Sequence, residues 1–299
     1  MKFPGLLRAT LTLMGMLSFA VGSHAAENEA SAENRFHLFT SKCEPEAATE
    51  GAETTPQSPP LNVDDPATPG CNRWEINVVL DGDFTRSDRS LELPLLDINY
   101  GIGDNIQLKY EVPNVNFQSD GVATQAVGES KAGVKYMFYE DEASKLALAV
   151  YPQVTFVDAS SDAVKKGLAS TGSITTLPFL VSKKIGELNG GEVNLSANIG
   201  YNISGKSEVK DYVSGAIGIG MPLYRRTSIA SELSTEQAVA ALPEEARSQL
   251  VRAAVGVVGP ITKEFLLFGS VGRSLVSSDE RDHTYVLAGF RLLAGGIVK

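Results

Sequence analysis

The chain has 299 residues, of which 43% are hydrophobic and 21% charged, and its formal net charge is −10. The 36 acidic residues outnumber the 26 basic ones, which disfavours a nucleic-acid binder, and two cysteines exclude a zinc ribbon or a disulfide-dense miniprotein. The ordinary overall hydrophobicity fits a soluble protein, but outer-membrane barrels share it because polar and apolar residues alternate along their strands.

Residues 1–25 have the pattern of a secretory signal peptide. Lys2 and Arg8 precede an uncharged stretch, 11–21, and the small residues that follow suit cleavage after Ala25. The alternative is an N-terminal membrane anchor, but the apolar stretch is short for a spanning helix. We therefore expect the mature protein to be exported.

An acidic, proline-rich segment follows at residues 26–72, with nine acidic and two basic residues. Its central part, 44–70, has few large apolar residues and cannot bury enough surface to offset its ordering entropy, so we expect a flexible periplasmic extension. Cys43 and Cys71 flank this part. We expect them to form a disulfide in an oxidising compartment, with free thiols or a metal-binding pair as the alternatives.

From Arg73 onward the dominant sequence period is two. Segment 193–203 shows this most clearly, with apolar residues at odd positions and Asn, Ser or Gly at most even positions. Such alternation places apolar side chains on one face of a strand and polar side chains on the other. The pattern predicts twelve strands, at 73–84, 90–100, 105–115, 129–139, 145–157, 173–185, 191–203, 210–221, 227–235, 249–259, 264–274 and 283–293.

These strands are long, and their connections alternate in length. Most have nine to thirteen residues, whereas a soluble strand has about five or six and a tilted membrane strand about nine to eleven. The long connections, 116–128, 158–172 and 236–248, all fall in the odd-numbered set, as expected for outer loops opposite short periplasmic turns. Residues 73–299 are therefore predicted to form an all-β, antiparallel transmembrane β-barrel of about 12 strands in the outer membrane. A soluble β-sandwich or lipocalin-like barrel is the alternative.

Several motifs resemble a known family. The run LELPLLDINYGIGDNIQLKYEVP at 91–113 and the strand GESKAGVKY within 127–142 resemble the bacterial outer-membrane "transporter" family associated with the meta-pathway of phenol degradation. Further matches are LPFLVSKKIG at 177–186, ANIGYN at 197–202 and SVGRSL at 270–275. The resemblance implies a monomeric outer-membrane β-barrel with a proposed role in passing hydrophobic or aromatic compounds. It supplies no set of substrate-contacting residues.

The functional candidates are the polar residues whose strand phase places them in the lumen. Four of them, Lys109, Glu111, Lys131 and Lys135, belong to neighbouring strands and form a predicted interior charge ladder. The ladder either neutralises itself and fills a narrow barrel, which we favour, or forms a constriction that filters solutes. The full set of lumen-lining candidates is Gln107, Lys109, Glu111, Lys131, Lys135, Gln153, Asn194 and Asn198.

The sequence contains little that points to catalysis. Of the three histidines only His283 lies on a predicted strand, beside Asp282, and a Ser–His–acid site would need partners that the sequence does not reveal. Gly101–Gly103 joins two strands, so it is predicted to be a tight turn and not a phosphate loop. Asp279, Glu280 and Asp282 lack the spacing of an EF-hand. We expect no cofactor, no metal and no catalytic residue.

Three functions are consistent with the sequence. The first is an outer-membrane channel for small, hydrophobic or aromatic solutes, with outer-membrane lipid as its surroundings and no nucleic-acid partner. The second is a structural or adhesive barrel in which the outer loops matter most, including the predicted helical turn at AVAALPEEAR in 236–248. The third and least favoured is an outer-membrane enzyme.

Overall fold

The structure is a computed structural model. It describes residues 34–36, 43, 52–239, 249–279 and 281–295, which all belong to one compact unit, Glu33–Lys299. The expected signal peptide, residues 1–25, lies outside the described residues. Among the described residues, no helix has the length and apolar character needed to cross a membrane.

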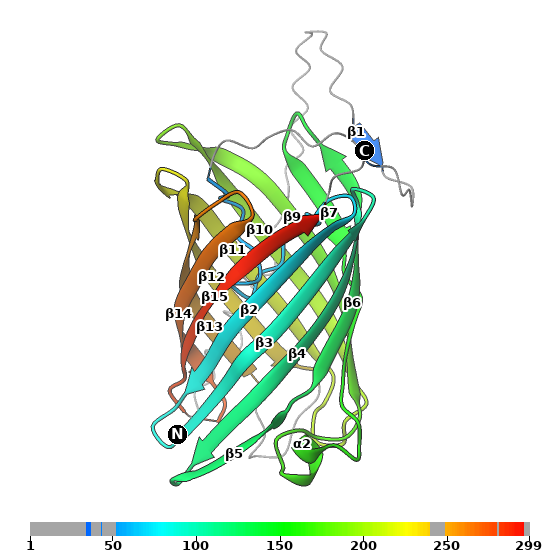
Figure 1. The fold of residues 1–299 in the computed structure, drawn as a ribbon, viewed down its shortest axis with the longest axis vertical. Coiled ribbons are helices and arrows are strands. Elements are labelled where there is room, and N and C mark those ends of the chain that lie inside the picture. Colours follow the sequence, from blue (N-terminus) through cyan, green and yellow to red (C-terminus); the bar gives the residue numbers. More distant parts are fainter. Residues whose placement is uncertain (1–33, 37–42, 44–51, 240–248, 280, 296–299) are drawn as a thin grey trace, which may run out of the picture. The chain divides into compact units, whose positions relative to one another are not determined.

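The described chain forms a closed, antiparallel, 12-stranded β-barrel, which confirms the predicted fold (Figure 1). Each wall strand pairs with the next one in sequence. The last strand, β15, pairs with the first, β2, from Thr284–Phe84 to Gly295–Arg73 and closes the wall. The wall strands are β2 (Arg73–Phe84), β3 (Asp88–Ile102), β4 (Ile106–Ser119), β6 (Ser130–Asp141), β7 (Leu146–Val150) continued by β8 (Gln153–Phe156), β9 (Ser173–Leu188), β10 (Gly191–Ser204), β11 (Tyr212–Tyr224), β12 (Thr227–Ala238), β13 (Gln249–Pro260), β14 (Phe265–Ser277) and β15 (Thr284–Gly295).

The orientation of the side chains distinguishes a membrane barrel from a soluble one. Along β10, Asn194, Ser196 and Asn202 are buried inside, whereas Ile199 and Tyr201 are more than 40% exposed on the outside. A soluble barrel would place its apolar residues inward, so this arrangement fits an outward face that contacts lipid. The soluble alternative is therefore not supported.

The two ends of the barrel differ in the length of their connections. One end, called the short-turn end, carries the connections 103–105, 142–145, 189–190, 225–226 and 261–264. The other, called the long-loop end, carries the described connections 85–87, 120–121, 157–172 and 205–211, and there β12 ends before β13 begins and β14 ends before β15 begins. Because Arg73 and Gly295 are register partners, the barrel begins and ends at the short-turn end, which matches the predicted phase of the loops.

Several predicted boundaries need correction. The expected loop 116–128 is largely a hairpin, because β4 continues to Ser119 and β5 (Val122–Val127) pairs with it. The expected strand 145–157 is interrupted between β7 and β8 at Pro152, which has no backbone N–H to donate. Loop 158–172 contains a short helix, α2 (Asp162–Lys165). In loop 236–248, β12 continues to Ala238, and residues 240–248, with most of the predicted helical turn, lie outside the described part.

The segment expected to be flexible is ordered over its described part, residues 52–70. Leu61 is 4% exposed and Val63 is fully buried. These residues are held against the barrel interior largely through polar contacts, which the composition of the segment alone does not reveal. The flexibility expected of the rest of the extension, 26–72, stays a prediction. The predicted disulfide between Cys43 and Cys71 is present, with the two Cα atoms 5.4 Å apart. A further short strand, β1 (Asn34–Phe36), pairs with Tyr139–Asp141 of β6.

Candidate functional site

Residues 52–70, called the lumen segment, occupy part of the barrel interior. Asn194 of β10 donates to Thr54 Oγ1 at 2.8 Å, Ser270 of β14 donates to the Pro60 carbonyl at 2.7 Å, and Lys135 of β6 donates to the Ala67 carbonyl at 3.0 Å. These three strands lie at separate positions around the wall, so the segment crosses the lumen between them (Figure 1). It returns to the short-turn end, where the chain enters β2.

Two buried charged residues of the wall hold the lumen segment. The Glu232 carboxylate of β12 accepts from the Val63 backbone N–H at 2.5 Å and from the Asn62 side chain at 2.9 Å. Hydrogen bonds to a charged group contribute about 1.5–3 kcal/mol each. Glu232 therefore holds Val63, the most buried apolar residue of the segment, against β12.

Arg291 of β15 fixes the other side of the segment. Its guanidinium donates to the Gln57 side chain at 2.7 Å and to the Pro59 carbonyl at 3.3 Å, while its Nε donates to Asn77 of β2 at 2.9 Å. Glu75 lies 3.4 Å away and balances its charge. A planar guanidinium suits this arrangement, because its five N–H groups serve the wall and the segment simultaneously.

Glycines of the wall let the segment approach the strands closely. A Cβ atom at Gly220 of β11 would lie 1.9 Å from the Thr54 carbonyl oxygen, and one at Gly101 would lie 1.8 Å from the Gly70 oxygen. At Gly218 it would lie 2.9 Å from Pro56 and 3.0 Å from Val63. These positions need glycine because the space of a side chain is taken by the segment's backbone at Gly220 and Gly101 and by its side chains at Gly218.

The predicted charge ladder exists, and a residue of β3 extends it. Lys109 lies 2.9 Å from Glu111 and 3.2 Å from Asp97, and Lys131 lies 3.0 Å from the same Glu111. The Gln107 side chain donates to Asn99 at 2.6 Å and to Tyr151 at 3.1 Å. The ladder is thus a bonded network across β3, β4 and β6, consistent with the interpretation that these charges neutralise one another.

The fourth ladder residue, Lys135, bonds to the lumen segment and not to the other three. Besides its bond to the Ala67 carbonyl, its ammonium lies 3.7 Å from Asp65 of the lumen segment and 5.0 Å from the centre of the Tyr151 ring. Burial raises the pKa of Asp65 to about 6, and Lys135 opposes that rise. Burial also raises the pKa of the neighbouring Asp64. This part of the segment therefore places two carboxyl groups where ionisation is costly.

The remaining predicted residues do not join the ladder. Asn194 faces the lumen and binds the lumen segment through Thr54. Gln153 and Asn198 are half-buried on β8 and β10. Their strand phase is the inward one, and their role as lumen-lining residues stays a prediction.

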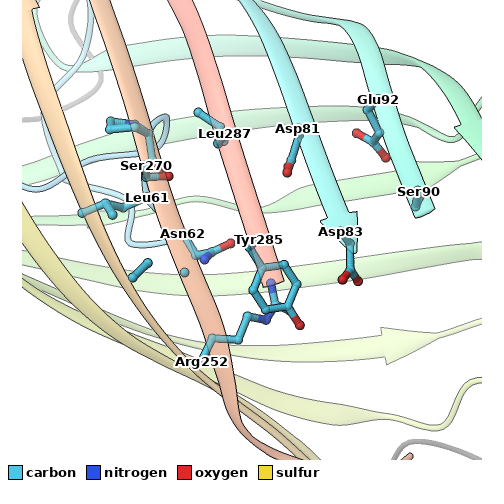
Figure 2. A pocket seen from close by; sticks show the side chains of 13 residues that line it. Leu61, Asn62, Asp81, Asp83, Ser90, Glu92, Arg252, Ser270, Tyr285 and Leu287 are labelled. Atoms are coloured by element: carbon cyan, nitrogen blue, oxygen red, sulfur yellow. Dashed lines mark hydrogen bonds between the residues drawn. The ribbon is translucent and has the colours of Figure 1, made fainter. Parts of the chain in front are cut away.

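Open space remains in the lumen beside Leu61 and Asn62 of the lumen segment. One cavity of about 420 Å³ is lined by Lys109, Glu111 and Lys131 together with Leu61 and Asn62. A second, of about 290 Å³, shares Leu61 and Asn62 and extends toward Arg252 and Tyr285. Figure 2 shows Asp81 and Asp83 from β2, Glu92 from β3 and Leu287 from β15 around this second space. Leu61 and Asn62 thus form part of the boundary of both cavities.

Asp81 and Glu92 are functional candidates that the sequence argument missed. They are register partners on β2 and β3, and both cavities border them. Within the described residues, neither side chain has a hydrogen-bond or ion-pair partner. Arg291 and Glu232 were missed as well. Asp81, Glu232 and Arg291 are charged residues in the inward phase of a predicted strand, and that signal would have identified them. Glu92 is brought inward by a register irregularity between Glu92 and Leu95, which strand phase alone does not predict.

The barrel wall has a seam beside the larger cavity. β4 pairs with β6 only from Ile106–Tyr136 to Glu111–Lys131, and residues 114–119 of β4 pair with β5 instead. The lumen side of this seam is lined by Pro113, Glu129 and Thr155. On the opposite side lies a groove of about 530 Å³, lined by Asn114, Gln125, Ala126, Val127, Gly128, Ser130, Phe156, Val157, Asp158, Ser161, Asp162 and Lys166. Adjacent residues of the same strands therefore border the lumen cavity and the outer groove.

His283 lies at the long-loop end and is buried. Its ring nitrogens lie 2.8 Å from an Asp83 oxygen and 3.0 Å from an Asp279 oxygen, and its ring stacks on Tyr285. Its backbone N–H donates to Ser274 Oγ at 2.9 Å. No cluster of three or more metal-ligating side chains occurs among the described residues. This arrangement ties the loop before β15 to β2.

The fold and the occupied lumen define a class of protein, the outer-membrane-type β-barrel. No protein-family model matches the sequence, and no curated protein matches it. The chain is similar in structure to an outer-membrane channel from Pseudomonas putida F1, with 14% identity and a TM-score of 0.60 over 78% of this chain and 100% of that one. It is also similar to the NanC porin, with 6% identity and a TM-score of 0.50 over 73% and 98% of the two chains. At these identities the likeness establishes the shared fold.

Proposed function

We propose that this protein is a monomeric outer-membrane channel for small solutes, exported with residues 1–25 as its signal peptide. The observation that carries the proposal is the space inside the closed wall, a cavity of about 420 Å³ lined by the charge ladder and bounded by the lumen segment. A barrel that served only as a scaffold has no need of such a cavity. Outer-membrane lipid then surrounds the apolar outward face.

We further propose that the solutes are hydrophobic or aromatic. The groove on the outer side of the seam is lined in part by Ala126, Val127, Phe156 and Val157, and Val127 is 59% exposed. A groove with an apolar part on the outer side of the wall, next to a lumen cavity, suits a solute that partitions into the membrane. The resemblance of residues 91–113 and 127–142 to the phenol-pathway "transporter" family supports the same solute class.

Reconstitution tests the proposal. Purified protein in planar bilayers should show ion conductance, and proteoliposomes should take up a small aromatic probe faster than liposomes without protein. Absence of both conductance and uptake would reject the channel. The favoured alternative would then be a structural or surface-interaction barrel without transport, for which the hydrogen-bonded segment inside the lumen is the supporting observation.

A further inference from the structure

The disulfide joins Cys43, which precedes the lumen segment in the chain, to Cys71 at the rim of the barrel. Cys71 lies directly before Asn72, whose backbone N–H donates to the Gly101 carbonyl at 3.0 Å and whose side chain accepts from Tyr100 at 3.1 Å. The Asn72 side chain also contacts Cys43 Sγ at 3.8 Å. The bond therefore holds Cys43 against a fixed part of the short-turn end.

We propose that the Cys43–Cys71 disulfide is a lock that keeps the lumen segment inside the barrel and so sets how often the lumen is open, an inference that rests on the channel function proposed above. Without the bond, the segment would be attached firmly at Arg73, where β2 begins. Before Cys43 in the chain, β1 pairs with β6 through three residues. With the bond, both ends of the loop are fixed at the same rim.

The contacts of the segment make such a lock effective. Apart from Leu61, Val63 and several prolines, they are polar contacts to Asn194, Glu232, Arg291, Ser270 and Lys135. Water replaces these contacts when the segment leaves the lumen, so each contributes only the net value of about 0.5–3 kcal/mol of a hydrogen bond exchanged with water. The balance between the two states is therefore sensitive to the freedom of the displaced loop.

Closing the loop reduces that freedom, whereas the inserted segment is ordered with or without the bond. For a separation of 28 residues, the chain-entropy relation gives a change of up to about 400-fold in the ratio of displaced to inserted segment when the bond is removed. Strand pairing of the wall does not depend on the bond, because the closed register from β2 to β15 begins after Cys71.

The test uses the complete folded protein in detergent or lipid, with and without dithiothreitol, which reduces the disulfide to two thiols and is itself oxidised to a cyclic disulfide. Amide hydrogen exchange of residues 52–70 reports the position of the segment independently of any transport. Exchange there should rise at least tenfold on reduction, while β10 and β14 keep their protection. The double variant Cys43→Ser with Cys71→Ser should show the raised exchange without reductant and should not respond to it, which controls for other effects of the reagent.

Unchanged exchange of residues 52–70 in both the reduced protein and the double variant would overturn the proposal. Retained protection of β10 and heat-modifiable gel mobility establish that the variant is folded. Conductance measured on the same samples tests the channel function separately. If exchange rises without any conductance, the lock stands and the channel function fails.

Discussion

A single methyl group at Gly220 should displace the lumen segment. The Cβ atom of a Gly220→Ala variant would lie 1.9 Å from the Thr54 carbonyl oxygen. Non-bonded carbon and oxygen atoms need about 3 Å or more, so the segment must move by roughly 1 Å or leave. A shift of that size strains the 2.8 Å bond between Asn194 and Thr54. Overpacking costs about 1–3 kcal/mol and a lost hydrogen bond about 0.5–1.5 kcal/mol.

These magnitudes raise the ratio of displaced to inserted segment by about tenfold or more, since 1.4 kcal/mol corresponds to a factor of ten. Hydrogen exchange of residues 52–70 and single-channel conductance both measure this ratio. Gly186→Ala on β9 is the matched control, because a Cβ atom there meets nothing within 4 Å. If the Gly220 variant and this control show the same exchange in residues 52–70, the segment does not lie against β11 and the reasoning is refuted.

Three further changes probe the site. Arg291→Lys keeps the charge, but a lysine cannot donate to Gln57, Pro59 and Asn77 together, so amide hydrogen exchange of residues 52–70 should rise by about tenfold or more. Arg273→Lys is the control, because the Arg273 side chain is 64% exposed. Equal effects of the two substitutions would contradict the role of Arg291. The pKa of Asp65 is about 6 in the inserted segment against an ordinary 3.8, so the inserted state binds this proton more tightly and gains stability as the pH falls through 6. Between pH 7 and pH 5 the gain from Asp65 is about 1 kcal/mol, or roughly tenfold less displaced segment, and Asp65→Asn should remove that part. The neighbouring Asp64, whose pKa burial also raises, acts in the same direction. The double variant Asp64→Asn with Asp65→Asn should therefore show no such dependence, and a persistent dependence would assign it to another group. Glu111→Gln removes the negative charge that faces Lys131 at 3.0 Å and Lys109 at 2.9 Å, so the reversal potential in a salt gradient should shift toward anion selectivity. An unchanged potential would place the ladder outside the conduction path.

The sequence was a good guide to the charge ladder and a poor guide to the lumen segment. Lys109, Glu111 and Lys131 were found because alternation gives the phase of each strand and adjacent strands lie side by side. Lys135 was grouped with the ladder, but its ion-pair partner is Asp65, from a segment 70 residues earlier in the chain. Strand phase describes the wall alone and carries no information on what fills the lumen.

The sequence by itself determined the barrel. Period-two alternation, strand length and the phase of the connections are local properties of the chain, and they fix an outward apolar face and an even, closed sheet. Only the tertiary structure decided that residues 52–70 enter the lumen. That outcome depends on the glycines at 101, 218 and 220 and on Glu232 and Arg291, which come together only when strands distant in sequence enclose the same space. The acidic, proline-rich composition that predicted flexibility describes the segment alone, whereas its order arises from the polar partners that the closed barrel supplies.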